Sequence, residues 1–126
     1  MSKSERDKVW DVFSKYIRLK YADWRGNESC VTCGIVKHWK EMQAGHFIAG
    51  RGNSILFDVR GVHPQCGRCN VYLKGNVVEY FRFMQKKYGD KVIDDLRVLR
   101  LKERKWKPKE LADMKEHYKE LINNLE

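Results

Sequence analysis

The segment Cys66-Gly67-Arg68-Cys69 repeats the C-x-x-C spacing of Cys30-Val31-Thr32-Cys33, and the two pairs contain every cysteine of the chain. The charged stretch from Met1 to Lys8 does not resemble a secretory signal, so we expect the chain to stay in a reducing compartment. Such compartments keep thiols from forming disulfides. Two such pairs are then typical of a tetrahedral structural zinc site, and a redox or disulfide role is the alternative. The predicted zinc ligands are Cys30, Cys33, Cys66 and Cys69.

Length and charge restrict the function further. The chain has 126 residues and a formal net charge of +9, which fits one domain with a modest core and excludes a large α/β enzyme. We expect a single domain, 1–126, with an N-terminal helix in 1–27, a zinc-bound core in 28–75 and C-terminal helices in 76–126. The positive charge suggests a polyanionic partner such as nucleic acid, and a merely solvated cationic surface is the alternative that charge alone leaves open. No apolar run approaches the ~20 residues of a membrane span, so we expect no membrane partner and a cytoplasmic location.

Helical periodicity dominates both ends of the chain. Apolar residues recur at steps of three and four from Val9 to Trp24, which predicts an amphipathic helix that starts at Ser4 and ends near Gly26. After the second cysteine pair we predict helices over 67–74, 77–88, 92–101 and 108–125.

Between the cysteine pairs the periodicity stops. Short strand-like pieces occupy 39–44, 46–49 and 55–59, and a glycine-rich loop lies between the last two. We interpret this region as a hairpin with a long tip, closed at its base by the cysteine pairs. Residues 34–65 make an insertion about twice as long as the roughly 15–20 residues between the pairs of a plain zinc ribbon.

The insertion and the residue after the last cysteine carry groups suited to phosphodiester hydrolysis. The neutral imidazole of His46 can take a proton from water near pH 7. A hard cation such as Mg²⁺ prefers oxygen ligands, including the side-chain carbonyl of Asn70, and needs few of them from protein. A zinc ion held by four thiolates has no open position for water, so it would be a scaffold only.

The chain resembles the phage NinG (Rap) recombination nucleases in the compound pattern C-x2-C-G, A-G-H-F, F-D-x-R-G-V-H-P-Q-C-x2-C-N, G-N, Y and Y-G, over about residues 28–126. Those proteins are similar to HNH, or His-Me finger, endonucleases. The segment from Arg60 to Asn70 is also similar to phage recombination endonuclease VII, a Holliday-junction resolvase.

The resemblance implies an α+β fold, in which a zinc-anchored ββα-metal core is flanked by an N-terminal helix and C-terminal helices. It implies a structure-specific, divalent-metal-dependent endonuclease that cuts branched recombination intermediates such as Holliday junctions and D-loops. Its cofactors would be structural Zn and catalytic Mg or Mn, its products 5′-phosphate and 3′-hydroxyl ends, and its location the cytoplasm of a bacterial host.

By the same resemblance, His46 matches the general base and Asn70 matches the last motif position, a ligand of the catalytic metal. Two positions depart from the pattern. Gly45 stands where HNH proteins often have a metal-binding Asp, and Gly61 stands where NinG-like proteins usually show Asn. These departures favour the rival hypothesis of a non-catalytic zinc-stabilised DNA-binding or adaptor module.

The second catalytic-metal ligand stays open between Asp58 and His63. Asp58 suits a hard cation, whereas His63 has a fixed place in the motif and is counted with the catalytic residues. The alternatives are a salt bridge from Asp58 to Arg60 or Arg51 and a pre-proline His63 packed beside the zinc. For Asn70 the alternative is a purely local role in the turn after the cysteines.

Basic residues around the predicted site are candidates for phosphate contacts, which position DNA without reading its sequence. The stretch 102–109 is a second candidate DNA surface, or else a solvated connector with Trp106 in the core. Two-fold cleavage of a four-way junction requires two active sites, which favours a homodimer. The candidate DNA-binding residues are Arg51, Arg60, Arg68, Lys74, Lys105 and Lys107.

Overall fold

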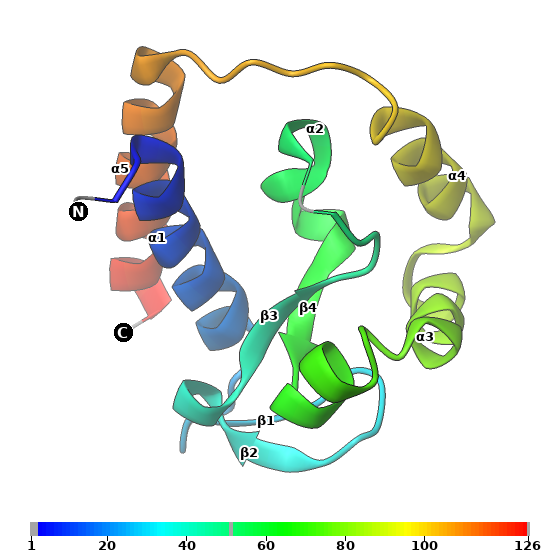
Figure 1. Cartoon of the computed structure of the whole chain (residues 1–126). Coiled ribbons are helices and arrows are strands. Elements are labelled where there is room, and N and C mark those ends of the chain that lie inside the picture. Colours follow the sequence, from blue (N-terminus) through cyan, green and yellow to red (C-terminus); the bar gives the residue numbers. More distant parts are fainter. Residues whose placement is uncertain (1–2, 51, 126) are drawn as a thin grey trace.

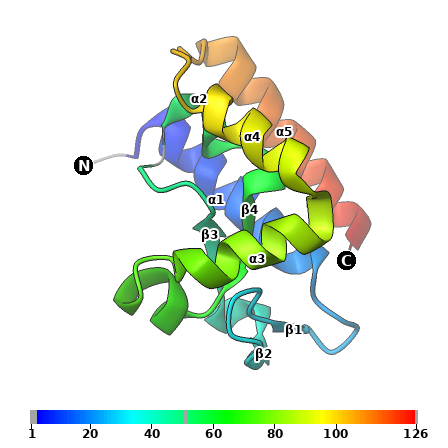
Figure 2. The ribbon, with the colours of Figure 1, turned by 90° about the vertical axis from the view of Figure 1, so that its right-hand side faces the viewer.

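The computed structural model describes residues 3–50 and 52–125 and places a central β-hairpin between two pairs of helices (Figures 1 and 2). One pair comes from opposite ends of the chain, α1 and α5, and the other is the consecutive pair α3 and α4. In chain order the elements are α1 (Glu5–Lys20), β1 (Asn27–Ser29), β2 (Val36–His38), η1 (Trp39–Glu41), β3 (Gln43–His46), α2 (Asn53–Leu56), η2 (Val59–Gly61), β4 (Val62–Gln65), η3 (Arg68–Tyr72), α3 (Val77–Tyr88), α4 (Asp90–Leu99) and α5 (Pro108–Leu125). Small sheets among helices confirm the predicted α+β class.

Helix α1 begins where the sequence predicts and ends earlier. The Ser4 hydroxyl accepts a hydrogen bond from the Asp7 N–H and caps the first turn. The helix stops at Lys20 rather than near Gly26, because the Asp23 carboxylate accepts two backbone N–H groups, including that of Asn27, and so favours a turn. As a result Trp24 lies outside the helix and is 86% exposed.

The main core lies between α1, α5 and the hairpin. Phe13 is fully buried and meets Phe57 and Tyr118 edge to face. The segment between α4 and α5 crosses over α2 (Figure 1), and there Trp106 packs against Phe57 and donates its indole N–H to the Asn53 carbonyl. Trp106 therefore packs on the core, which agrees with the interpretation of 102–109 as a solvated connector with Trp106 in the core.

The hairpin is present, but its second arm differs from the prediction. Strand β3 pairs antiparallel with β4, so that Gly45 lies opposite His63. The predicted strand over 55–59 is wrong: its apolar residues belong to α2, the turn after it and the start of η2, and β4 follows at Val62. A short apolar run is compatible with a buried strand and a buried helical turn alike, and here packing against α1 selects the helix.

The C-terminal helices follow the predicted order. α3 and α4 meet at Gly89, whose φ of 89° suits glycine, and they enclose a second core around Tyr80 and Leu96. The predicted helix over 67–74 is reduced to the single π-helical turn η3, since the backbone turns to positive φ from Lys74 to Asn76. No helix in the described part of the chain has both the length and the apolar character needed to cross a membrane.

Phe13 and Trp24 provide a direct test of where α1 packs. We expect Phe13→Ala to lower the free energy of unfolding by about 3–5 kcal/mol, because it leaves a cavity in the core. Trp24→Ala should change it by no more than about 0.5 kcal/mol, since that side chain is largely in solvent. Urea unfolding of both variants measures the difference, and equal losses would contradict the packing described.

Candidate functional site

Four cysteine sulfurs form one cluster at the base of the hairpin. Cys30 and Cys33 lie in the turn between β1 and β2, Cys66 follows β4, and Cys69 lies in η3. All four Sγ atoms are within 4.8 Å of one another, and those of Cys33 and Cys66 are 3.7 Å apart. Tetrahedral zinc with Zn–S bonds of ≈ 2.3 Å separates its sulfurs by about 3.8 Å. The donor set therefore fits, and the four predicted ligands can hold a structural zinc ion.

The surroundings of the cluster favour the thiolate of Cys30 and disfavour that of Cys33. Burial opposes ionisation of Cys30, but hydrogen bonds from the Thr32 hydroxyl and nearby backbone N–H groups outweigh it and lower the pKa of this thiol to about 6. Burial and the neighbouring sulfurs instead raise the pKa of Cys33 to about 12. Side-chain N–H groups also reach the cluster, since the Asn76 amide donates to Cys69 Sγ at 3.6 Å. A bound divalent cation would offset the repulsion between neighbouring thiolates, and so would allow the thiols that ionise last to lose their protons.

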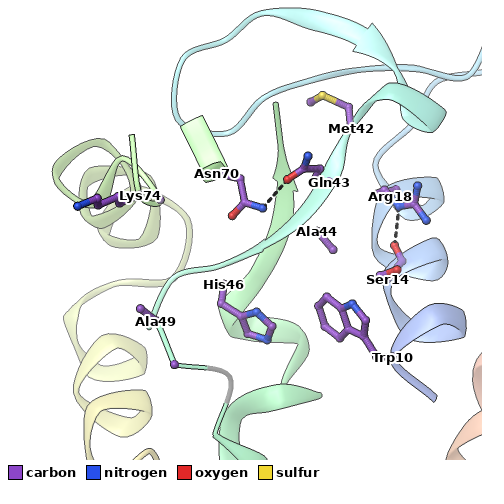
Figure 3. Close-up of a pocket in the computed structure, with 12 residues that line it drawn as sticks. Trp10, Ser14, Arg18, Met42, Gln43, Ala44, His46, Ala49, Asn70 and Lys74 are labelled. Carbon is purple, nitrogen blue, oxygen red and sulfur yellow. Dashed lines mark hydrogen bonds between the residues drawn. The ribbon is translucent and has the colours of Figure 1, made fainter. Parts of the chain in front are cut away.

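A cleft of about 470 Å³ opens beside the hairpin, between α1, β3 and η3 (Figure 3). His46 lines it from the end of β3 and Asn70 lines it from η3, so the two residues of the proposed chemistry share one cavity. Among the described residues around this cleft there is no carboxylate. The lining residues are Trp10, Ser14, Arg18, Met42, Gln43, Ala44, His46, Ala49, Gly50, Asn70, Lys74 and Gly75.

His46 is fixed by contacts on two sides. Its ring stacks on Trp10 of α1 with centroids 5.0 Å apart, as Figure 3 shows. Its Nε2 lies 3.1 Å from the carbonyl oxygen of Leu56. A carbonyl only accepts hydrogen bonds, so this contact assigns the proton of the neutral ring to Nε2 and the lone pair to Nδ1.

The side chain of Asn70 is oriented by β3. Its amide nitrogen donates to Gln43 Oε1 at 2.7 Å (Figure 3). Its Oδ1 lies 3.1 Å from the point where a Cβ on Gly45 would stand. Asn70 therefore offers a carbonyl-type oxygen, the kind of donor that a hard cation accepts. The hydrogen bond to Gln43 joins Asn70 to a distant strand, whereas a purely local role in the turn, the alternative for this residue, would involve only neighbouring residues.

His63 is not part of this cleft, and the structure corrects its assignment as an active-site residue. It is fully buried, with Nδ1 3.0 Å from the Tyr80 hydroxyl and Nε2 2.8 Å from the Tyr88 hydroxyl. Burial, with the charges of Lys87 and Lys20, lowers the pKa of His63 to about 3. A fully enclosed side chain with both ring nitrogens engaged cannot contact a substrate, so His63 is a core residue.

Asp58 also lies outside the cleft lining, which removes it as a ligand beside Asn70. Its carboxylate accepts hydrogen bonds from Arg60 Nη2 at 2.8 Å and Nε at 3.0 Å, and from the Arg60 backbone. Burial alone would raise the pKa of Asp58, but the guanidinium lowers it below the ordinary value. The salt bridge to Arg60 is therefore the alternative that the structure supports.

The candidate phosphate contacts are dispersed. Lys74 lines the cleft, but its ammonium points away from Asn70 (Figure 3), and Arg68 is exposed on η3. Lys105 borders a second depression of about 670 Å³ with Lys102 and Arg100, and Lys107 is exposed nearby. Arg51 lies outside the described residues.

Sequence reasoning missed the contribution of α1 to the cleft. Trp10 and Arg18 line it, although Trp10 belongs to the apolar series from which the sequence predicts this helix. The fully buried positions of α1 are Val9, Phe13 and Ile17. Trp10 and Arg18 each follow a buried position by one residue, and this offset is the signal that separates them from the core face.

Comparison with known proteins gives one family. The family model described as "Bacteriophage Lambda NinG protein" matches residues 2–126. "Protein ninG" of Salmonella phage P22 is 27% identical over 97 residues, which cover 76% of this chain and 47% of that protein. The same-named protein of Escherichia phage lambda is 26% identical over the same shares of both chains. The chain thus spans about half the length of these relatives, and no solved structure matches it.

Replacement of one predicted zinc ligand tests the cysteine cluster. We expect Cys69→Ser to lose the metal and most of the folded structure, because structural zinc contributes on the order of 10 kcal/mol to folding of small domains. Val71→Ser, an exposed position on the same turn as Cys69, keeps all four thiols and their partners, so it is the matched control and should retain one zinc per chain. Metal content and circular dichroism measure both, and unchanged zinc in Cys69→Ser would contradict the site.

The buried His63 predicts a pH dependence of stability. Between the ordinary pKa of 6.5 and about 3, the unfolded chain binds a proton at His63 and the native chain does not, so stability falls as the pH falls. From pH 7 to pH 5, wild type should lose about 2 kcal/mol more unfolding free energy than His63→Gln. Urea titrations with matched zinc content measure this, and equal losses would show that His63 is protonated in the native state.

Proposed function

Because the chain belongs to the NinG family, we propose that it is a divalent-metal-dependent endonuclease of the HNH type, which hydrolyses phosphodiester bonds in branched DNA. The observation that carries the proposal is the shared cleft of His46 and Asn70. An imidazole with a fixed tautomer and a carboxamide oxygen reach this cavity from two separate elements, β3 and η3. The net charge of +9 suits a DNA substrate.

His46 is the general base of the proposed reaction. The Leu56 carbonyl holds the proton of the neutral ring on Nε2, so Nδ1 accepts the proton of the attacking water. Stacking on Trp10 prevents the ring from rotating out of this orientation. The same carbonyl then stabilises the imidazolium that forms, because it accepts a stronger hydrogen bond from a charged ring.

Asn70 would hold the catalytic Mg²⁺ or Mn²⁺ through Oδ1, with Gln43 keeping the amide nitrogen turned away. When bound, such a cation offsets the negative charge that develops on the phosphate and the leaving oxygen. Because the described lining contains no carboxylate, water and the substrate phosphate must supply most of its ligands, as they commonly do for Mg²⁺.

The proposed substrates are Holliday junctions and D-loops, and the proposed products carry 5′-phosphate and 3′-hydroxyl ends. Exposed basic residues on η3 and on the α4–α5 segment, Arg68 and Lys105 among them, would contact phosphates outside the cleft. Such contacts select DNA by shape rather than by sequence. A homodimer would supply the two active sites that symmetric junction cleavage requires.

A non-catalytic zinc-stabilised DNA-binding or adaptor module is the second candidate. It is favoured by Gly45, which offers no side-chain ligand, and by the absence of a carboxylate from the described lining. This function gives salt-sensitive binding to branched DNA and no strand cleavage with Mg²⁺ or Mn²⁺.

Replacement of His46 distinguishes the two functions. We expect His46→Ala to lower the rate of nicking of a synthetic four-way junction by about 10²–10⁴-fold, the usual contribution of a general base. Zinc content and junction binding should stay unchanged, since the imidazole is not a zinc ligand.

His117→Ala is the matched control, because His117 is exposed on α5 and is not among the described residues that line the cleft. It should cut at the wild-type rate. Cleavage by His46→Ala at the wild-type rate would remove His46 from the mechanism, and no cleavage by wild type with either metal would favour the adaptor module.

A further inference from the structure

The cleft beside the hairpin has a positively charged lining. Arg18 reaches it from α1 and Lys74 reaches it from the residue that follows the end of η3, and no described lining residue is acidic. A concave surface that carries charge of one sign attracts ligands of the opposite sign. This cavity of about 470 Å³ is therefore suited to an anion.

Arg18 belongs to a row of side chains on one face of α1. Trp10, Ser14 and Arg18 are spaced by four residues, so they follow one another along that face, and all three line the cleft. Trp10 stacks on His46 at one end of the row. A helical rise of ~1.5 Å per residue places Arg18 about 12 Å further along the axis. Arg18 and His46 therefore occupy different parts of one cavity.

Two contacts orient the guanidinium of Arg18. Its Nε donates to the Ser14 carbonyl at 3.1 Å (Figure 3). Its Cζ lies 5.4 Å from the centroid of the Trp39 ring. Its two terminal nitrogens donate to no group in the part of the chain that the structure describes. A planar guanidinium held in this way presents its remaining N–H groups as a fork, which matches the oxygens of a phosphate.

Arg18 also lacks an ion pair within the described residues. The side chain is half-buried, and burial lowers the pKa of Arg18 below its ordinary value of 12.5, although the group stays protonated at neutral pH. The charge of the buried Glu28 opposes this shift. Neither carboxylate oxygen of Glu28 has a described hydrogen-bond partner, so Glu28 does not occupy the fork. A partly desolvated cation is stabilised by an anion that accepts its hydrogen bonds.

The positive charge continues outside the cleft around Trp39. Lys15 Nζ and Lys40 Nζ each lie 5.8 Å from the centroid of the same ring that Arg18 contacts. Three cations around one indole repel one another, and η1 contributes a single acidic residue, Glu41. Phosphates bound along this surface would offset the repulsion.

We propose that Arg18 binds a DNA phosphate beside the one that is hydrolysed, and that Lys15 and Lys40 bind the next phosphates of the same strand. The proposal rests on the proposed function for DNA as the ligand. The distance along α1 places Arg18 on a neighbouring phosphate rather than on the one next to His46. Because phosphates carry no sequence information, these contacts fix where the strand enters the cleft.

Binding of a fluorescent four-way junction to the zinc-loaded protein tests this separately from cleavage. Fluorescence anisotropy is measured without added Mg²⁺ or Mn²⁺, over a range of salt concentrations. We expect Arg18→Gln to weaken binding by about 10-fold, the effect of losing a hydrogen-bonded charge contact. The slope of log K against log salt concentration should become shallower by about 0.9, because one phosphate contact is lost.

Arg97→Gln is the matched control for this loss of charge. Arg97 is exposed on α4 and is not among the described residues that line the cleft. This variant should bind the junction about as tightly as wild type. Arg18→Lys keeps the charge without the planar fork, so its affinity should lie between those of wild type and Arg18→Gln. If Arg18→Gln fails to fold, Arg18→Lys replaces it, with a smaller effect in the same direction.

Neutral phosphates locate the contact on the DNA. Methylphosphonates replace one phosphate at a time around the branch point of the junction. At the phosphate that Arg18 binds, this change should weaken binding to wild type by about 10-fold and binding to Arg18→Gln much less, because both changes remove the same contact.

The proposal is overturned if Arg18→Gln and Arg97→Gln bind the junction equally, or if no methylphosphonate position distinguishes Arg18→Gln from wild type. Junction cleavage by wild type would then leave the proposed function standing. The expected loss in Arg18→Gln without cleavage by wild type would support the phosphate contact and count against the nuclease. If wild type binds no DNA, the proposed function and this contact fail together.

Discussion

Four cysteine sulfurs from two segments far apart in the sequence lie within 4.8 Å of one another, and the position of the rest of the site depends on this cluster. Closing a loop of this length costs about 4 kcal/mol of chain entropy, whereas a structural zinc ion contributes on the order of 10 kcal/mol. The cluster fixes the end of β4 and the turn η3 together. Since Asn70 directly follows Cys69, it fixes the position of the carboxamide as well.

The other wall of the cleft depends on packing between the ends of the chain. Helix α1 is held against the hairpin by a core that includes α5, and it carries Trp10 to the face of the His46 ring. The Leu56 carbonyl reaches the same ring from α2, which Trp106 holds through Asn53. The orientation of one imidazole thus requires contacts from three separate parts of the chain.

One face of β4 carries polar side chains into the interior. His63 is enclosed by tyrosine hydroxyls and belongs to the core with α3. Gln65, two residues later on the same face, is equally buried, and its amide nitrogen donates to Thr32 and to the Gly75 carbonyl. A polar residue type beside a motif is therefore no guide to function until its hydrogen-bond partners are known.

The sequence by itself determined the α+β class, the four clustered cysteines, the start of α1 and the helices over 77–88 and 108–125. These features follow from local spacing, capping and periodicity, which neighbouring residues express without the rest of the fold. It also singled out His46 and Asn70, which line one cleft. Only the tertiary structure decided that 55–59 is not a strand, that His63 is core, that Asp58 pairs with Arg60, and that Trp10 adjoins the site. Each of these depends on which distant group occupies the space beside a side chain, and such long-range contacts leave no periodic pattern in the chain.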